Sequence, residues 1–304
     1  MADEVTRSTL TVEHPTHGAI TVHTLQPETN AGLPVCLFLF GGGGTADNLW
    51  DIQPLLEAGW RDGTIPPMRV ACPGVDPWCF YLDDPARGMA WESAVAGAAL
   101  DAVTDADPPC GIVGMSMGGY GALKIAFARP RVFGAVAAVA PMIEPSTDAA
   151  ATPPRNRSHY PPQCPAALVG PDRDAVLFRA DHPAQRARVH AAEILDAALA
   201  IHLDAGSRDA LHAHDGAEYL HRTLWDLDVR HAYHLHADAD HVGPSLGPRL
   251  RDAFAFVGDH LTGRRPAPIS ADEAGLREMI APAMRAAAAT DPTVDRVYGA
   301  LSAD

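Results

Sequence analysis

The chain has 304 residues, of which 47% are hydrophobic and 20% are charged. These proportions are ordinary for a folded globular protein, and the length allows one large α/β domain or one domain with an appendage. The 38 acidic and 23 basic residues give a net charge of −15, which argues against a nucleic-acid partner and against binding to an anionic membrane surface.

The N-terminal segment and the cysteines indicate the compartment. Residues 1–7 include acidic residues and no apolar run, so no secretory signal is visible. No segment approaches the roughly 18 uninterrupted apolar residues of a transmembrane helix. The five cysteines are odd in number, scattered, and contain no C-x-x-C pair. We therefore expect a reduced, cytoplasmic protein.

The first half of the chain alternates between strand-like and helix-like segments. Residues 8–13 and 19–25 alternate polar and apolar side chains, as half-buried strands do, and 35–40 is apolar throughout, as a central strand is. The other elements expected here are a helix over 46–58, a strand over 68–72, a helix over 89–104, strands over 110–114 and 134–140 and, between these two, a helix that stops before Pro130.

The second half continues this alternation after an excursion over residues 143–198. The excursion is rich in proline as far as Pro165 and then becomes helical from about 184 to 198. The elements expected beyond it are a strand over 199–203, a helix over 216–226, a strand over 230–236 and a helix over 246–261. Strands and helices in alternation predict a mostly parallel sheet with helices on both faces.

Residues 110–125 place a serine between a strand and a helix. A short apolar run leads into a G-x-S-x-G segment at 114–118, and helix-forming residues follow. A tight turn can project a serine hydroxyl toward a base, and the flanking glycines remove Cβ atoms where strand and helix approach closely. The pattern predicts that Ser116 is a catalytic nucleophile. The alternative is a glycine-rich turn that only closes a sheet.

A serine nucleophile needs a general base, and the base needs a carboxylate to orient it. Suitable residues follow two late strands. His241 lies beyond the strand over 230–236, and we predict that it is the base, the alternative being a solvent-exposed histidine. Asp204 and Asp209 both follow the strand over 199–203. Asp209 is the preferred acid because Asp204 stands at the strand end, where it could cap the turn, but both stay open.

Other titratable residues near His241 are less suited to chemistry. Asp238 and Asp240 flank the predicted base too closely in sequence to orient it, so we expect solvated acids. His234 and His236 share one strand face and could ligate a metal together, but no cysteine accompanies them, and His241 is better used as the base. We therefore expect no metal and no cofactor.

A tetrahedral intermediate needs two preorganised backbone donors. We expect one to be the amide of Met117, directly after the nucleophile, and the other to be the amide of Gly42. The four glycines at 41–44 permit backbone shapes that other residues resist. The alternative for this run, a phosphate-binding loop, lacks the Gly-Lys-Ser/Thr ending of a P-loop.

These segments resemble the esterase D family, which includes S-formylglutathione hydrolases, feruloyl and acetylxylan esterases, and mycolyltransferases of the antigen 85 type. The resemblance spans roughly residues 30–261, and the segments that carry it are Gly114–Leu123, Leu203–Asp209, Asp240-His241, and Phe40 with the glycines after it. It implies an α/β-hydrolase fold and assigns Ser116, Asp209 and His241 to a catalytic triad. It also places the two oxyanion donors at Gly42 and Met117.

The sequence thus predicts a serine-dependent hydrolase of a carboxylic ester or thioester, acting on a small molecule through an acyl-enzyme on Ser116. An acyltransferase using the same residues is the close alternative, because water and an acceptor compete for one intermediate. A catalytically silent binding protein on the same scaffold is the third reading. Trp50, Tyr81 and Tyr120 are candidates for the substrate pocket, although aromatic residues are also routine core residues. The acyl and alcohol groups stay unidentified.

The catalytic domain is expected to cover residues 1–262, with 143–198 as a cap, and a helical extension to cover 263–304. Within the extension, Ser270 and Glu273 form a capping box, and apolar residues then recur at helical spacing. A lone amphipathic helix of this length is marginal in water, so its apolar face needs a partner. That partner is either the body of the enzyme or a second subunit, which would make the protein a homo-oligomer.

Overall fold

The computed structural model describes residues 5–28, 32–104, 110–157, 160, 162–164, 174–264, 282 and 286. The chain divides into two units, residues 1–264 and 265–304. The expected helical extension, and the subunit contact expected through it, therefore lie almost entirely outside the described residues.

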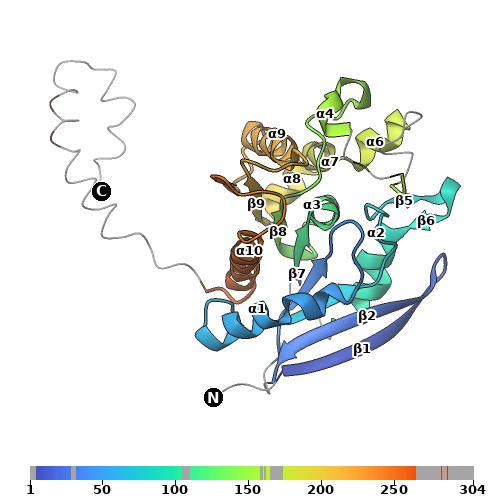
Figure 1. Ribbon diagram of the computed structural model, residues 1–304, viewed down its shortest axis with the longest axis vertical. Coiled ribbons are helices and arrows are strands. Elements are labelled where there is room, and N and C mark those ends of the chain that lie inside the picture. Colours follow the sequence, from blue (N-terminus) through green and yellow to red (C-terminus); the bar gives the residue numbers. More distant parts are fainter. Residues whose placement is uncertain are drawn as a thin grey trace. The chain divides into compact units, whose positions relative to one another are not determined.

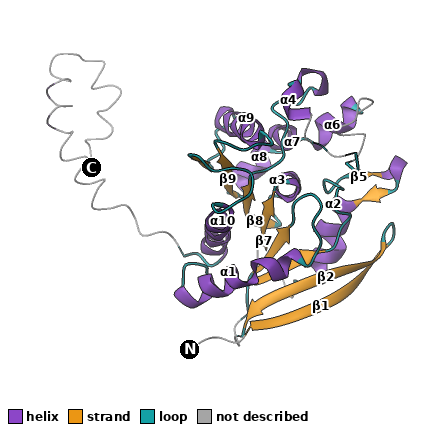
Figure 2. Cartoon of the chain, viewed as in Figure 1, coloured by secondary structure: helices purple, strands orange, loops and turns teal. Residues whose placement is uncertain are grey.

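One large sheet forms the centre of the first unit. Its strands are β1 (Val5–His14), β2 (Gly18–Pro27), β3 (Val35–Leu39), β4 (Arg69–Pro73), β7 (Cys110–Met115), β8 (Phe133–Val139), β9 (Ala200–Gly206) and β10 (Ala232–His236). They lie in the order β1-β2-β4-β3-β7-β8-β9-β10 (Figures 1 and 2). The pairs β1–β2 and β2–β4 are antiparallel, and every other neighbouring pair is parallel.

The mostly parallel sheet predicted from the sequence is confirmed. Because β3, β7, β9 and β10 run in the same direction, their carboxyl ends meet at one edge of the sheet, where parallel α/β folds place their ligands. The segments that follow these four strands carry Gly42, Ser116, Asp209 and His241.

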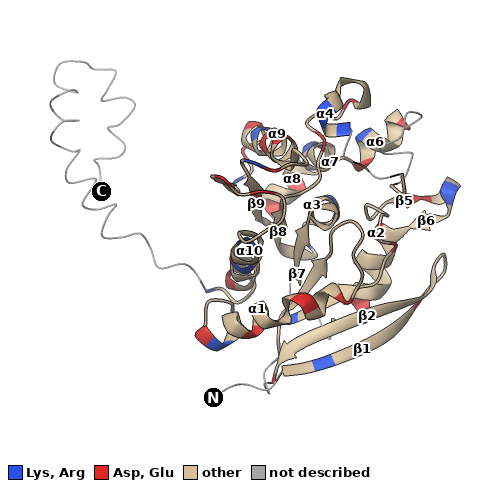
Figure 3. Cartoon of the chain, in the orientation of Figure 1, with Lys and Arg blue, Asp and Glu red and all other residues tan. Residues whose placement is uncertain are grey.

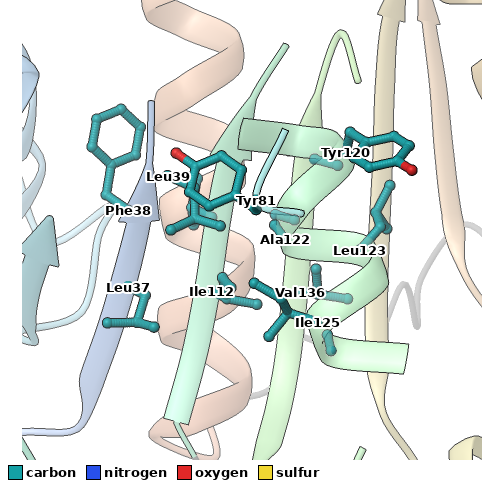
Figure 4. Packing of buried hydrophobic residues seen from close by; sticks show 14 of the residues in the cluster. Leu37, Phe38, Leu39, Tyr81, Ile112, Tyr120, Ala122, Leu123, Ile125 and Val136 are labelled. Carbon is teal, nitrogen blue, oxygen red and sulfur yellow. The ribbon is translucent and has the colours of Figure 1, made fainter. Parts of the chain in front are cut away.

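Helices cover both faces of the sheet. On one face α1 (Asn48–Asp62) and α10 (Leu246–Leu261) contact each other; on the other, α3 (Met117–Ala128) packs against β7, β8 and α7 (Pro183–Val189), which contacts α9 (Ala213–Asp226) (Figure 1). A Cβ atom added to Gly111 of β7 would meet Val257 and Leu261 of α10. Ile112, the next residue of β7, belongs to the same buried cluster as Leu123 and Ile125 of α3 (Figure 4).

Several expected helices begin, end or continue differently in the structure; α1 and α9, for example, were expected over 46–58 and 216–226. The helix expected over 89–104 begins at Trp91, because β6 (Met89–Ala90) pairs with β5 (Asp83–Asp84); it continues as α2 (Trp91–Ala94) and a π-turn (Val95–Ala99). The helical stretch expected over 184–198 is confirmed. It is divided into α7 and α8 (Ala191–Asp196) at His190, whose backbone leaves the helical region with ψ 15°.

The excursion is joined to the nucleophile helix by a buried ionic cluster. It contains α4 (Pro154–Arg157), α6 (Ala175–Asp181), α7 and α8. Lys124 of α3, the chain's single lysine, is fully buried and lies 2.5 Å from Asp181 and 3.2 Å from Glu92. Arg186 of α7 lies 3.2 Å from Glu92 and 3.5 Å from Asp181. Two cations balance two carboxylates, as buried charges require.

Charged side chains lie mainly on the helices and connecting loops (Figure 3), and the central strands β3, β7 and β8 carry none. Those strands contribute the buried apolar residues packed against α3 in Figure 4. No helix among the described residues is long and apolar enough to cross a membrane.

Glycine is required where α3 passes beneath β3. A Cβ atom on Gly118 would stand 1.9 Å from the carbonyl oxygen of Leu39, which is backbone and has no room to move aside.

We expect Gly118→Ala to destabilise the protein by roughly 3 kcal/mol or more, the upper end of the cost of overpacking. The matched control is Gly247→Ala in α10, where nothing lies within 4 Å of the added Cβ and helix propensity favours alanine. Urea unfolding of both variants tests this, and equal midpoints would contradict it.

Two buried histidines should make the fold sensitive to acid. Burial lowers the pKa of His182 and of His202 from 6.5 to about 4 in each case. Since the unfolded chain then binds these protons more readily, their contribution to stability is present above pH 6.5 and is lost as the pH falls toward 4.

His202→Leu should reduce this loss, because Nε2 of His202 has no hydrogen-bond partner among the described residues and the ring packs against His234 and Phe256. The variant should retain up to about 3 kcal/mol of the stability that the wild type loses between these pH values. Melting temperatures measured from pH 7 to pH 4.5 test this, with the exposed His260→Gln as the control. An unchanged pH dependence in His202→Leu would contradict the assignment.

Candidate active site

Ser116 occupies the turn between β7 and α3 in a backbone conformation that residues with side chains rarely adopt. Its φ is 56° and its ψ is −118°. The turn is held from both sides: the amide of Ser116 donates to Val139 of β8, and its carbonyl accepts from Met142. A strained residue that its surroundings hold in place is a common feature of functional sites. The residue is 8% exposed and lies at the carboxyl edge of the sheet.

Ser116, His241 and Asp209 form a continuous hydrogen-bonded chain. Nε2 of His241 lies 2.9 Å from Oγ of Ser116, and Nδ1 of His241 lies 2.7 Å from Oδ2 of Asp209. A carboxylate only accepts, so Nδ1 carries the proton and Nε2 is left to accept from the serine hydroxyl. The side chain of Asp209 is fully buried, and its Oδ1 also accepts the amide of Leu211 at 2.8 Å.

Asp204, the other acid left open by the sequence, has different partners. Its Oδ1 accepts from Nε of Arg249 at 2.6 Å, and its Oδ2 lies 2.5 Å from Nε2 of His236. Both Asp204 and Arg249 are 1% exposed. The geometry therefore associates Asp209, rather than Asp204, with His241.

Asp240 joins the loops that carry the acid and the histidine. Its Oδ1 accepts the amide of His241 at 2.6 Å and the amide of Ala210 at 2.9 Å. These two amides, Ala210 first, lower the pKa of Asp240. Asp240 is exposed, as expected of a solvated acid, and so is Asp238, whose side chain is 85% exposed, but Asp240 also bonds these two amides. Sequence reasoning missed this role because a lone aspartate beside a histidine has no distinctive spacing.

The glycine loop after β3 passes directly beside the nucleophile. A Cβ atom on Gly41 would stand 3.3 Å from Cβ of Ser116. The amide of Gly43 donates to the carbonyl of Pro77, and the amide of Gly44 donates to the carbonyl of Gly41. Gly42 lies within the turn that the second of these bonds closes. Met117 opens α3, and the first amides of a helix have no partner within it. The structure thus brings the loop that contains Gly42 close to Ser116, and α3 begins at Met117, the next residue.

Trp78, which the sequence did not single out, packs against this loop. A Cβ atom on Gly42 would stand 2.5 Å from the indole ring, and one on Gly43 would stand 3.1 Å from it. Only glycine lets the loop lie so close to the ring. Trp78 therefore limits the conformations open to the backbone beside Ser116.

The three aromatic candidates for the pocket lie in different places. Trp50 of α1 packs against His23 of β2, and the guanidinium of Arg7 lies 4.8 Å from the centre of the Trp50 ring. Trp50 therefore packs against the edge of the sheet formed by β1 and β2. Tyr81 is fully buried, and its hydroxyl donates to the carbonyl of Phe40 at 3.1 Å. Tyr120 is 5% exposed, and its hydroxyl donates to Asp181 at 2.8 Å. As placed, Trp50 and Tyr81 support the fold rather than line an open pocket.

One group of potential metal ligands occurs among the described residues, at the start of α9. Ligand atoms of His212, His214 and Asp215 lie within 4.8 Å of one another. Both carboxylate oxygens of Asp215 already accept from Arg155, at 2.9 and 3.0 Å. The guanidinium supplies the positive charge that this carboxylate needs, so the group is explained without a metal.

Residues 98–242 match the model of the Esterase family. No curated protein matches the chain. Among solved structures, a ferulic acid esterase is 18% identical, with a TM-score of 0.67, and the match covers 85% of this chain and 99% of that one.

Two further solved structures are similar to this chain. The fluorophosphonate-binding serine hydrolase F of Staphylococcus aureus is 17% identical, with a TM-score of 0.67 and coverage of 83% and 98%. The S-formylglutathione hydrolase of Agrobacterium tumefaciens is 19% identical, with a TM-score of 0.64 and coverage of 86% and 97%. These likenesses show a shared fold over most of each chain. Residues 98–242, which include Ser116 and His241, are thus similar to the Esterase family, and the chain is built on an α/β-hydrolase fold.

Proposed function

We propose that this protein is a serine hydrolase that cleaves a carboxylic ester or thioester through an acyl-enzyme on Ser116. The observation that carries the proposal is the hydrogen-bonded chain from Ser116 through His241 to Asp209, on a strained turn at the carboxyl edge of the sheet. That arrangement supplies a nucleophile, a base in the required tautomer, and a buried carboxylate that orients the base.

The reaction follows from these positions. His241 accepts the hydroxyl proton of Ser116 as Oγ attacks the substrate carbonyl, and Asp209 stabilises the imidazolium. The amides of Gly42 and Met117 are the proposed donors to the oxyanion. His241 then gives its proton to the leaving alcohol or thiol. Water, activated by the same histidine, attacks the acyl-enzyme and releases the acid.

The nature of the acyl group is a further proposal. Structural relatives named for ferulic acid esters and for S-formylglutathione support an oxygen or sulfur ester of a small molecule as the substrate. Transfer of the acyl group to an acceptor other than water remains the alternative, because both reactions share the acyl-enzyme. Turnover with added alcohols distinguishes them: a hydrolase releases mainly free acid, and a transferase releases mainly the new ester.

We also propose that the enzyme works in the cytoplasm. All five cysteines are buried free thiols, as in proteins of reducing compartments. The net charge of −15 supports the expectation that neither nucleic acid nor an anionic membrane is a partner.

Ser116→Ala tests the nucleophile. It should lower kcat by about 10³-fold or more and abolish labelling by a fluorophosphonate, because no acyl-enzyme can form. The matched control is Ser245→Ala, at the start of α10, where the hydroxyl makes no capping hydrogen bond. More than a tenth of the wild-type activity in Ser116→Ala would rule out the nucleophile.

Asp209→Asn and Asp204→Asn distinguish the catalytic acid from the structural one. Asp209→Asn should lower kcat by about 10⁴-fold, because an amide cannot hold His241 in the required tautomer. Asp204→Asn should lower kcat less but reduce the free energy of unfolding by about 3 kcal/mol, because Arg249 stays buried without its counter-ion. Steady-state kinetics and urea unfolding of both variants test this, and the reverse order of kcat values would assign the acid to Asp204.

A further inference from the structure

Arg249 lies behind the loop that carries His241, and the proposed chemistry leaves it without a role. It projects from the first turn of α10 and is 1% exposed. Its Nε donates to Oδ1 of Asp204 at 2.6 Å, and its Nη2 lies 2.5 Å from the same oxygen. Its Nη1 donates to the backbone carbonyl of Asp240 at 2.9 Å. The guanidinium therefore joins the end of β9 to the residue directly before His241.

Asp240 is held at three points by this arrangement. Its carbonyl accepts from Arg249, and its Oδ1 accepts the amides of His241 and Ala210. Ala210 directly follows the proposed catalytic acid. The position of one residue therefore fixes the histidine loop relative to both the acid loop and α10.

The two loops also contact each other through their backbones. The amide of Arg208 donates to the carbonyl of Ala239 at 3.0 Å, and the amide of Ser207 donates to the carbonyl of His236 at 2.9 Å. A Cβ atom on Gly206 would stand 2.3 Å from the carbonyl of Ala239. These contacts set the distance between the loops, and the guanidinium sets the orientation of the peptide that enters His241.

We infer that Arg249 is a positioning residue for His241, an inference that rests on the proposed function. Only a planar guanidinium can bind a carboxylate and donate to a carbonyl in another direction with fixed geometry. Lysine keeps the charge but lacks the fork. Misplacement of a catalytic group by about 1 Å costs on the order of 10²-fold in rate. Arg249 should therefore affect kcat without contacting the substrate.

Arg249→Lys is the first test. It keeps the charge opposite Asp204 and loses the second, divergent hydrogen bond, so kcat should fall at least about tenfold while KM changes little. The matched control is Arg251→Lys on the same helix. The partners of Arg251 are Asp62 and Thr64, which are exposed and distant in sequence from the residues of the site. Its kcat should equal that of the wild type. Equal kcat values for both variants would overturn the inference.

Chemical rescue separates positioning from simple stabilisation. Arg249→Ala leaves a buried space of the shape of a guanidinium, so millimolar guanidinium ion should restore much of the lost kcat, and methylammonium, which lacks the fork, should not. If Arg249→Ala does not fold, Arg249→Lys decides alone. A fall in kcat that follows the loss of folded protein and shows no rescue would assign Arg249 a structural role only and overturn the inference.

A measurement independent of turnover distinguishes this inference from the proposed function. The proton shared by Nδ1 of His241 and Asp209 should give a downfield NMR resonance, identified by its loss in His241→Gln. We expect Arg249→Lys to shift or broaden it and Arg251→Lys to leave it unchanged. A wild-type protein that shows this dependence but hydrolyses no ester would refute the proposed function alone. If the wild type is active but neither the resonance nor kcat changes in Arg249→Lys, the positioning role alone is refuted.

Discussion

The strained turn at Ser116 is the constraint on which the site depends. A positive φ at a residue with a side chain is unfavourable by itself, and it persists because neighbouring elements leave no alternative. The amide of Ser116 is bonded to β8, and α3 begins at the next residue, with Gly118 against the backbone of β3. The same close approach brings the loop of Gly41 beside Oγ. The strained backbone, Ser116 and the loop of the proposed oxyanion donor Gly42 are therefore parts of one packing arrangement.

The other half of the site comes from far along the chain, so it needs a separate means of alignment. His241 and Ser116 are 125 residues apart, and their side chains meet only because β7, β9 and β10 end at one edge of the sheet. Parallel strands set the loops side by side but do not determine side-chain angles. Asp240 and Arg249 supply that determination through directional hydrogen bonds to backbone groups.

The sequence predicted the sheet, most helices and the residues of the hydrogen-bonded chain, because each carries a local signal. Apolar runs identify buried strands, and G-x-S-x-G identifies an elbow. Arg249 carried no such signal, since an arginine on an amphipathic helix ordinarily lies at the surface. Tyr81 was a candidate for the pocket, but it is fully buried and its hydroxyl donates to the carbonyl of Phe40, because aromatic residues serve both purposes. These roles depend on tertiary contacts that spacing does not encode.

Two buried ionic clusters lie behind the site, and their positions explain why charge is used there. One joins Lys124 of α3 to Asp181 and Glu92, and the other joins Arg249 to Asp204. Burying ions is costly, and apolar side chains of similar volume often stabilise a fold as well or better. Apolar contacts, however, tolerate rotation and sliding, whereas a guanidinium or ammonium between carboxylates has only a few good geometries. Each cluster lies where the orientation of a helix relative to the sheet matters for the site. One holds α3, which begins directly after Ser116, and the other holds α10, which packs behind the loop of His241. We interpret the two clusters as the contacts that fix the orientation of α3 and α10, and with it the distance between Ser116 and His241.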